Sequence, residues 1–332
     1  MSEYRKDPIT GHWVIIARHR AQRPRQFSAS NNPSRNEPCP FCTGNEAMTP
    51  PEVWARRMPN TAADAPGWSV RVVPNKFPAL DRESTWQESS DSIHETRPGL
   101  GAHEVIIESP DHVVNFGDLG DDRLTDVLTA YRARLRAYRQ DRRWRYLLIY
   151  KNQGDRAGAT LEHVHSQLIA LPDVPREASD ELAGSKGHYA ATGRCIYCDS
   201  IDREIAQGQR LVFNHDRFIA LCPFAPRFAY ETWILPKTHG AVFEQISEQE
   251  NGAFARALSE AMARVNHGLG NPPFNYFIHS LPTDEAAADH YHWHLEILPQ
   301  LSRAAGFEWG TGSHINPVAP EDAAKLLRDV AL

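Results

Sequence analysis

Alternating polar and apolar residues mark one stretch of the chain in which histidines gather on a single face. Residues 163–171, "HVHSQLIAL", are predicted to form a strand, and the alternation places His163, His165 and Gln167 on one side of it. A buried row of polar side chains costs free energy unless those side chains bind something. The pattern therefore indicates a metal site, a phosphate site or both.

In two other stretches, apolar residues recur at the spacing of an α-helix. Residues 121–138 place an apolar stripe at helical spacing, and residues 247–262 repeat this less regularly. Each is followed by an apolar strand, residues 144–152 or 274–280, and then by a His-x-His segment. This mixture predicts an α+β fold in which mainly antiparallel sheet is backed by helices.

The order of these elements occurs twice. Residues 102–116 and 229–243 share an alanine, a glutamate, an apolar strand, a histidine and a phenylalanine in ungapped register. The chain is therefore predicted to be a tandem duplication, with one half in residues 1–175 and the other in residues 190–332. We expect the polar, glycine-bearing segment 173–194 to be a loop. We expect the two sheets to join edge to edge, because each half alone leaves an open edge.

Four of the five cysteines form two C-x-x-C pairs. One such pair alone could equally be a redox dithiol or two buried small residues. Each pair, however, is followed by two histidines, 51 residues apart in the first half and 53 in the second. We therefore predict about two zinc ions per chain, each in a closed tetrahedral site. The expected ligands are Cys39, Cys42, His112 and His163 in the first half, and Cys195, Cys198, His239 and His292 in the second.

The second histidine of each His-x-His pair, His165 or His294, is not needed as a zinc ligand and could take part in catalysis. Ahead of His165, the segment 152–163 carries Gly154, Gly158 and Thr160, which could bring backbone N–H groups close to an anion. Ahead of His294 the corresponding segment is acidic and has no glycine, so only the first half is predicted to be catalytic. A histidine beside bound phosphate can attack phosphorus, and Gln167 can donate a hydrogen bond to the phosphoryl oxygen. Eight further histidines are expected to be ordinary surface or core residues: His12, His19, His94, His103, His188, His215, His267 and His314.

Composition narrows the class of protein. The chain has 332 residues, of which 41% are hydrophobic, and a formal net charge of −6. The negative charge gives no general attraction to nucleic acid, and no apolar run reaches the roughly 18 residues of a membrane span. The amino terminus lacks the pattern of a signal peptide, so we expect a cytoplasmic protein whose cysteines are not disulfide-bonded.

Five motifs, in order and spacing, resemble the galactose-1-phosphate uridylyltransferase family of the histidine-triad superfamily over nearly the whole chain. They are "YRKDPITGHWVIIARHRAQRP", "CPFC", "NKF", "SPDH" and "HVHSQ". The resemblance implies two tandem histidine-triad-like halves, a homodimer, and His165 as the nucleophile that accepts the nucleotidyl group. It further implies that Gln167 contacts the phosphate and that the nucleotide is bound by Arg20, Arg23, Asn75, Phe77, Asn152, Gly158, Thr160 and Phe307.

Two departures from the family pattern bear on the substrate. Lys76 stands where the family has an acidic residue, and near the carboxyl end "GFEWGTG" keeps only Phe307 and Gly310 of the stretch expected to hold sugar hydroxyls. That end looks more like the ADP-glucose phosphorylase branch. The leading expectation is exchange of a nucleotidyl group between a nucleotide sugar and a sugar 1-phosphate, as galactose-1-phosphate uridylyl transfer. The alternative is adenylyl transfer from ADP-glucose to phosphate.

Two other classes of protein fit some of these features. A zinc-containing nucleic-acid-binding protein would use the basic segment 132–145. The wide separation of the C-x-x-C pairs, the negative charge and a solvated helix face argue against that class, so we expect no nucleic acid or membrane partner. A nucleotide hydrolase fits these features better than a nucleic-acid-binding protein, because water could hydrolyse the same covalent nucleotidyl-histidine.

Overall fold

The computed structural model describes residues 2–9, 13–17, 38–83, 89–285 and 288–332. Its strands are β1 (Glu3–Lys6), β2 (Trp13–Ile16), β3 (Trp54–Arg57), β4 (Trp68–Pro74), β5 (Ser89–Ser90), β6 (Glu95–Pro98), β7 (Ala102–Ile107), β8 (Tyr146–Gln153), β9 (His165–Leu171), β10 (Leu211–Asn214), β11 (Phe218–Leu221), β12 (Thr232–Pro236), β13 (Phe274–His279) and β14 (His294–Pro299). Its α-helices are α1 (Gly120–Arg139), α2 (Arg176–Thr192), α3 (Ile196–Gln207), α4 (Glu248–Leu269), α5 (Gly306–Thr311) and α6 (Pro320–Asp329). The described chain thus has the predicted mixture of strands and helices.

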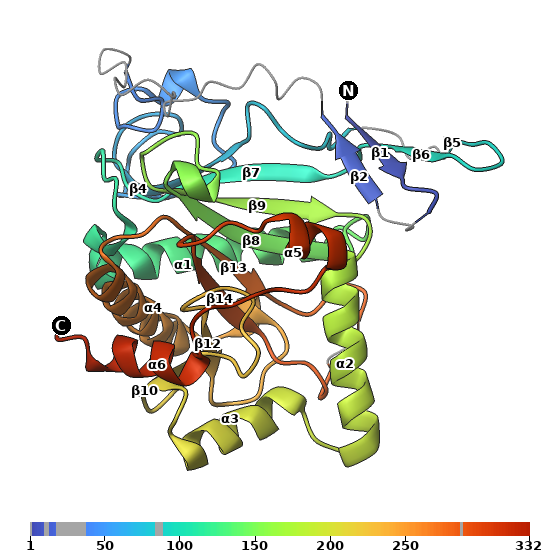
Figure 1. Ribbon diagram of the computed structural model, residues 1–332. Coiled ribbons are helices and arrows are strands. Elements are labelled where there is room, and N and C mark those ends of the chain that lie inside the picture. The colour runs from blue at the N-terminus through green and yellow to red at the C-terminus, as the bar shows by residue number, and fades with distance from the viewer. Residues whose placement is uncertain (1, 10–12, 18–37, 84–88, 286–287) are drawn as a thin grey trace.

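One large sheet dominates the molecule (Figure 1). Its ten strands follow the order β10-β11-β12-β14-β13-β8-β9-β7-β4-β3, and a separate small sheet has the order β2-β1-β6-β5. Every pairing between neighbouring strands of these sheets is antiparallel. The predicted α+β class, with mainly antiparallel sheet, is confirmed.

The two halves meet at the pairing of β8 with β13. On either side of this pair the order is the same, since β9, β7, β4 and β3 on one side correspond to β14, β12, β11 and β10 on the other. The register extends across the join: Gln167 pairs with Tyr150, Tyr150 with Phe277, and Phe277 with Glu296. The expectation that the two sheets join edge to edge is confirmed. The division into domains 1–175 and 190–332 stays a prediction.

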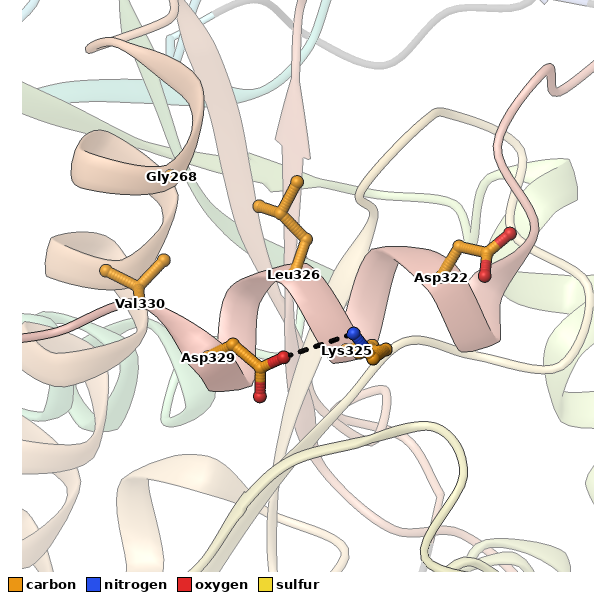
Figure 2. A pocket seen from close by; sticks show the side chains of 6 residues that line it. All are labelled: Gly268, Asp322, Lys325, Leu326, Asp329 and Val330. Atoms are coloured by element: carbon orange, nitrogen blue, oxygen red, sulfur yellow. Dashed lines mark ion pairs between the residues drawn. The ribbon is translucent and has the colours of Figure 1, made fainter.

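Helices α1 and α4 pack against each other over the sheet, and their apolar stripes share one core with both halves. The hydroxyl groups of Tyr131 in α1 and Tyr276 in β13 lie 2.6 Å apart inside it. Helix α6 lies against α4, where an added Cβ at Gly268 would be 3.0 Å from Leu326 and Val330 (Figure 2). A residue without a side chain therefore permits this close approach. Within the described residues, no helix is long and apolar enough to cross a membrane.

The segment expected to be a loop between the halves is mostly helical, so this expectation is wrong. Helix α2 begins after Pro175 and ends at Gly193, which has a φ of 71° in the left-handed region. It buries Ala178 and Leu182, and its two internal glycines are tolerated because this apolar contact holds the helix in place. In Figure 1, α2 stands on the opposite side of the view from α4 and α6.

Three arginines of α1 do not lie on a solvated face, contrary to expectation: Arg132, Arg134 and Arg139. Arg134 makes two hydrogen bonds of 2.8–2.9 Å with the carboxylate of Glu104. Arg132 is buried and donates to the carbonyl group of Ile246 at 2.5 Å. Arg139 forms an ion pair with Glu244 of the second half. These three side chains tie α1 to the rest of the protein, so they are not available as nucleic-acid contacts.

Candidate active site and metal centres

The first four predicted ligands converge. Cys39, Cys42, His112 and His163 place their ligand atoms within 4.8 Å of one another. The Nδ1 atom of His163 lies 3.6 Å from the sulfur of each cysteine, and that of His112 lies 3.3 Å from Cys42 Sγ. Tetrahedral zinc, with Zn–S near 2.3 Å and Zn–N near 2.0 Å, requires a sulfur-to-nitrogen separation of about 3.5 Å. These residues therefore fit a zinc ion.

The tautomer of His163 suits a metal ligand. Its Nε2–H group donates a 2.8 Å hydrogen bond to the carbonyl oxygen of Ser109, which leaves Nδ1 unprotonated toward the thiols. Burial lowers the pKa of His163 to about 4, so the ring is neutral at pH 7. Phe41, between the two cysteines, packs edge-on against this ring at 5.9 Å and against His165 at 5.3 Å.

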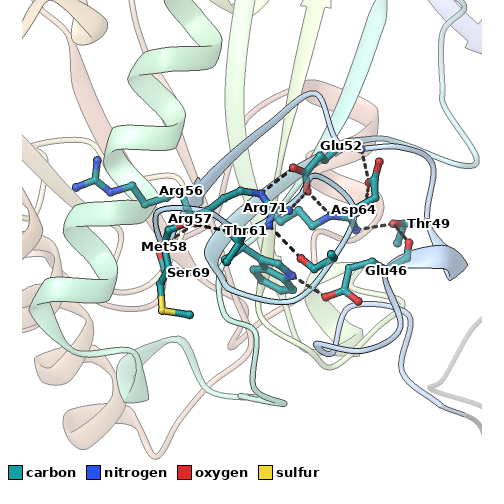
Figure 3. A network of polar contacts seen from close by, with 12 residues as sticks. Glu46, Thr49, Glu52, Arg56, Arg57, Met58, Thr61, Asp64, Ser69 and Arg71 are labelled. Atoms are coloured by element: carbon teal, nitrogen blue, oxygen red, sulfur yellow. Dashed lines mark hydrogen bonds and ion pairs between the residues drawn. The ribbon is translucent and has the colours of Figure 1, made fainter.

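A polar network holds the chain that follows the first C-x-x-C pair (Figure 3). The Trp68 Nε1–H group of β4 donates to Glu46 at 2.8 Å. Arg71, almost fully buried in β4, donates to Thr49 at 2.6 Å and to Glu52 at 3.0 Å. Because Arg71 is paired on several sides, its charge is satisfied without solvent. The network fixes the segment that follows the cysteines onto the sheet.

The second ligand set repeats this geometry. Cys195, Cys198, His239 and His292 also place their ligand atoms within 4.8 Å of one another. Cys198 Sγ lies 3.4 Å from His239 Nδ1 and 3.6 Å from His292 Nδ1. The Nε2–H group of His292 donates to the carbonyl oxygen of Pro236 at 2.9 Å, as that of His163 does to Ser109. Each half thus has one group of residues that could hold a metal ion.

His165 is the first residue of β9 and is buried at 5% exposure. Its Nδ1–H group faces the carbonyl oxygen of His163 at 2.8 Å, so the ring presents the lone pair of Nε2 on its other side. This is the tautomer that a histidine nucleophile needs, because the attacking nitrogen must be unprotonated. The metal-binding residue and the candidate nucleophile are therefore positioned by the same short stretch of backbone.

Gln167 lies two residues farther along the same face of β9, beside a histidine that the sequence did not single out. Its Oε1 atom is 2.8 Å from Nε2 of His103 and 3.1 Å from the hydroxyl group of Tyr150. His103 is buried in β7, and Nδ2 of Asn75 is 3.2 Å from its Nε2 atom. The register of β7 against β9 would have revealed His103, because it shares a face with Val105, the residue that pairs with Gln167.

The glycines of the expected phosphate loop have a conformational role. Gly154 and Gly158 have φ values of 83° and 85°, which other residues rarely adopt. The N–H group of Gly158 donates to Asp155 at 2.8 Å, and that of Ala159 donates to Gly154 at 3.2 Å. Both N–H groups close the turn of the loop itself, so that of Gly158 does not face an anion as expected. Thr160 follows the loop and is half-buried.

Asn152 is oriented by the second half of the chain. Asn275 of β13 donates from Nδ2 to the carbonyl oxygen of Ala157 at 2.9 Å and to Oδ1 of Asn152 at 2.8 Å. Since a backbone carbonyl only accepts, the amide nitrogen of Asn275 must face Ala157. The Nδ2 group of Asn152 is then on the side of Gly158, where an added Cβ would lie 3.8 Å from it.

The remaining expected nucleotide-binding residues are not all brought to this place. Asn75 lies next to His103, and the Phe77 N–H group donates to Asn75 Oδ1 at 2.9 Å. Phe307 lies on α5 with half of its side chain exposed, and its carbonyl group accepts a hydrogen bond within the same helix. Arg20 and Arg23 lie outside the described residues.

The equivalent position in the second half has lost the features of a phosphate site. His294 keeps the geometry of His165, with Nδ1 at 3.1 Å from the carbonyl oxygen of His292. Glu296 replaces Gln167, and carboxylate oxygens of Glu296 and Glu181 lie 3.5 and 3.6 Å from His294 Nε2. Two carboxylates at this distance repel a phosphate group. The prediction that only the first half is catalytic is thus consistent with the charges found in the second.

These carboxylates lie beside two histidines, His279 and His294. Burial opposes ionisation of Glu181, yet His279 and His294 hold the pKa of its carboxyl group well below the usual value. Burial likewise opposes the charge on His279, but Glu181 and Glu296 raise the pKa of the imidazole. Glu181, His279 and His294 could together hold a metal ion as well.

Each half has a His-x-His strand, and amide side chains lie beside the one in the first half, which fits a nucleotidyltransferase; its relatives place the chain in that class. Residues 1–175 match the family model described as "Galactose-1-phosphate uridyl transferase, N-terminal domain", and residues 100–330 match a domain of unknown function. The chain belongs to the galactose-1-phosphate uridylyltransferase family.

Relatives of two activities cover nearly the whole chain. An ADP-glucose phosphorylase of Arabidopsis thaliana is 38% identical over 99% of this chain and 93% of its own length. A galactose-1-phosphate uridylyltransferase of Thermotoga maritima is 28% identical over 99% of this chain and 98% of its own. The crystal structure of an ADP-glucose phosphorylase from Arabidopsis thaliana with bound ADP-glucose superposes with a TM-score of 0.78 at 36% identity, covering 100% of both chains. A uridylyltransferase structure superposes with a TM-score of 0.80 at 28% identity, covering 98% of this chain and 97% of that chain.

Proposed function

We propose that this protein transfers a nucleoside monophosphate from a nucleotide sugar to a phosphate-bearing acceptor through a covalent intermediate on His165. The observation that carries the proposal is the buried ring of His165, whose Nδ1–H group is held by the carbonyl oxygen of His163 at 2.8 Å. This contact directs the lone pair of Nε2 into the face that also carries Gln167, and it stabilises the positive charge that the ring acquires on attack.

The reaction consists of two displacements at the same phosphorus atom. Nε2 of His165 attacks the α-phosphorus, the bond from that phosphorus to the bridging oxygen breaks, and the sugar 1-phosphate leaves. An oxygen of the acceptor phosphate then attacks, and the nitrogen–phosphorus bond breaks to restore the neutral ring. Gln167 donates from its amide nitrogen to a non-bridging oxygen of the nucleotidyl group in both steps, and Asn152 holds the phosphates near Gly158.

Each Cys2His2 group is proposed to hold zinc. The sulfur-to-nitrogen distances of 3.3–3.6 Å and the metal-facing tautomers of His163 and His292 support this assignment. Bound zinc supplies a closed structural site that fixes its ligands in place. In the first half this fixes His163, whose carbonyl oxygen in turn orients His165.

Among the nucleotide sugars, we propose ADP-glucose with inorganic phosphate as acceptor. The 38% identity to an ADP-glucose phosphorylase supports this choice, as do Lys76 and the departures around Phe307. Uridylyl transfer between UDP-glucose and galactose 1-phosphate, the leading expectation from sequence, is the second candidate. The family model over residues 1–175 and the 28% identity to a uridylyltransferase favour it.

Product analysis decides between the two. The protein is incubated with ADP-glucose and phosphate, or with UDP-glucose and galactose 1-phosphate, and the nucleotides are separated by chromatography. The proposal expects ADP from the first mixture at a specificity constant at least about tenfold above that for UDP-galactose from the second, the size that one or two pocket contacts can give. Faster formation of UDP-galactose would reverse the choice, and release of free AMP or UMP would indicate a hydrolase.

The resemblance also implies a homodimer, which we propose here and which light scattering of the purified protein would test. The cytoplasmic location stays a prediction.

A further inference from the structure

The amide of Gln167 can face the nucleotidyl phosphate in two ways, and they have opposite consequences. With its nitrogen outward it donates to a phosphoryl oxygen, whereas with its oxygen outward it repels one. The two ends of an amide are alike in shape, so packing alone does not choose between them. Something next to Gln167 must set the direction.

His103 is the neighbour that can set it, because its own protonation is dictated by the backbone. The N–H group of Ala79 donates to Nδ1 of His103 at 3.1 Å. A backbone N–H group can only donate, so Nδ1 carries no proton. The neutral ring then carries its proton on Nε2, and this N–H group points to the Gln167 Oε1 atom at 2.8 Å.

Two other side chains, Tyr150 and Asn75, bear on this tautomer. Tyr150 donates its hydroxyl proton to the same Oε1 atom at 3.1 Å, so both lone pairs of that oxygen are used. Asn75 places Nδ2 at 3.2 Å from Nε2 of His103, a longer contact that would favour an unprotonated nitrogen there. The Asn75 amide is itself held by the Phe77 N–H group. The proton stays on Nε2 of His103 because Ala79 donates to Nδ1 and because Gln167 Oε1 accepts from Nε2 at 2.8 Å, a shorter contact than the 3.2 Å to Asn75.

We propose that His103 is a positioning residue, whose Nε2–H group holds the Gln167 oxygen and thereby turns the Gln167 amide nitrogen toward the nucleotidyl phosphate. The backbone N–H group of Ala79 thus fixes the tautomer of His103, and this tautomer fixes the orientation of the Gln167 amide. This proposal rests on the proposed function, since it assigns how the phosphate-contacting amide of that site is held. His103 itself touches Gln167 rather than the reacting atoms.

The test compares three replacements of His103 that differ in what they offer to Gln167. Glutamine can place an amide N–H group where Nε2–H stands, leucine offers nothing, and glutamate offers only an acceptor. His215→Gln, directly after β10, is the matched control, since this ring lies 2.7 Å from Glu260 at the surface. The readouts are the single-turnover rate of His165 nucleotidylation with ADP-glucose or UDP-glucose, and the Kd of the nucleotide sugar by calorimetry.

The rate with His103→Gln is expected to stay within about threefold of the native rate, because a donor is retained. His103→Leu is expected to lose about tenfold, and His103→Glu about 10²- to 10³-fold, the cost of losing one donor to a developing oxyanion. In a Gln167→Ala background the three replacements should give equal rates, because the amide that His103 orients is absent. The Kd should follow the same order.

Two results would overturn the proposal. One is a His103→Glu protein as fast as His103→Gln; the other is an unchanged spread of rates in the Gln167→Ala background, which would mean a purely structural effect. Unchanged zinc content and melting temperature show that each variant is folded. If the native protein binds the nucleotide sugar without forming an adduct, the proposed function fails, while the order of the Kd values still tests the role of His103.

Discussion

Replacing the amide of Gln167 by a carboxylate should give the first half the same repulsion of phosphate that Glu296 produces in the second half. Glu296 occupies the position equivalent to Gln167, two residues after its histidine and in the same row across the sheet. We therefore predict that Gln167→Glu inactivates the protein more strongly than Gln167→Ala. The replacement is nearly isosteric, and His103 and Tyr150 can still donate to one carboxylate oxygen, so the fold should be retained.

The size of the effect follows from the charge. A carboxylate about 4 Å from a singly charged phosphate costs about 4 kcal/mol at an effective dielectric constant of about 20, which corresponds to a factor of about 10³. Loss of the donated hydrogen bond multiplies this, whereas Gln167→Ala loses only the donor, at about 10² to 10³. The total for Gln167→Glu should therefore be at least about 10⁵, because the two effects add as free energies.

The assay is single-turnover formation of the nucleotidylated protein, followed by rapid quenching and intact mass measurement, with melting temperature as the check on folding. Because the repulsion involves an ionised carboxylate, the Gln167→Glu rate should recover partly toward pH 5, while the Gln167→Ala rate should not show this additional recovery. A Gln167→Glu protein that equals Gln167→Ala at pH 7.5 would refute the reasoning.

Four further predictions follow from other parts of the structure. Cys39→Ser should lower the zinc content of the purified protein from about two ions per chain to about one, measured by elemental analysis, because a closed site needs all four ligands; an unchanged content would end the assignment. Asn275→Leu should slow nucleotidylation about fivefold to tenfold, the net worth of one hydrogen bond, because Asn152 loses the partner that orients it; a native rate would contradict this orientation. Lys151→Met should lower the free energy of unfolding by about 3 to 5 kcal/mol in urea denaturation, since it leaves Glu108 buried without its partner at 2.5 Å; a loss below about 1 kcal/mol would contradict that pairing. Glu181→Gln should destabilise the protein most between about pH 4.5 and 6.5. The pKa of Glu181 is depressed by folding, so this carboxylate stabilises the fold above its unfolded pKa, whereas the pKa of His279 is raised, so this imidazole stabilises the fold below its unfolded pKa. Equal destabilisation at about pH 5.5 and about pH 9 would speak against the Glu181–His279 pair.

The metal groups and the joined sheets could be predicted because their causes are visible in sequence. A tetrahedral site needs two pairs of ligands, and repeated spacing identifies Cys39, Cys42 and their histidines without any knowledge of the fold. An open sheet edge in each half likewise predicts that β8 and β13 pair, since an unpaired edge is unfavourable.

His103 could not be found in the same way. Its importance arises from the register of β7 against β9, which brings it next to Gln167 across 64 positions of sequence. The tautomer that makes it useful depends on the N–H group of Ala79, which comes from a separate loop. Helix α2 was missed for a related reason, because its glycines and polar residues resemble a loop until the burial of Leu182 is known.

The central claim is that a nucleotidyl group becomes bonded to Nε2 of His165. The most direct measurement is intact mass spectrometry of the native protein after incubation with ADP-glucose or UDP-glucose without acceptor, followed by peptide mapping of the modified residue. The account predicts one nucleoside monophosphate per chain on the peptide that contains His165, removed on addition of phosphate or galactose 1-phosphate, and no adduct in a folded His165→Ala variant. No adduct with either nucleotide sugar, or an adduct on His294 instead, would contradict it.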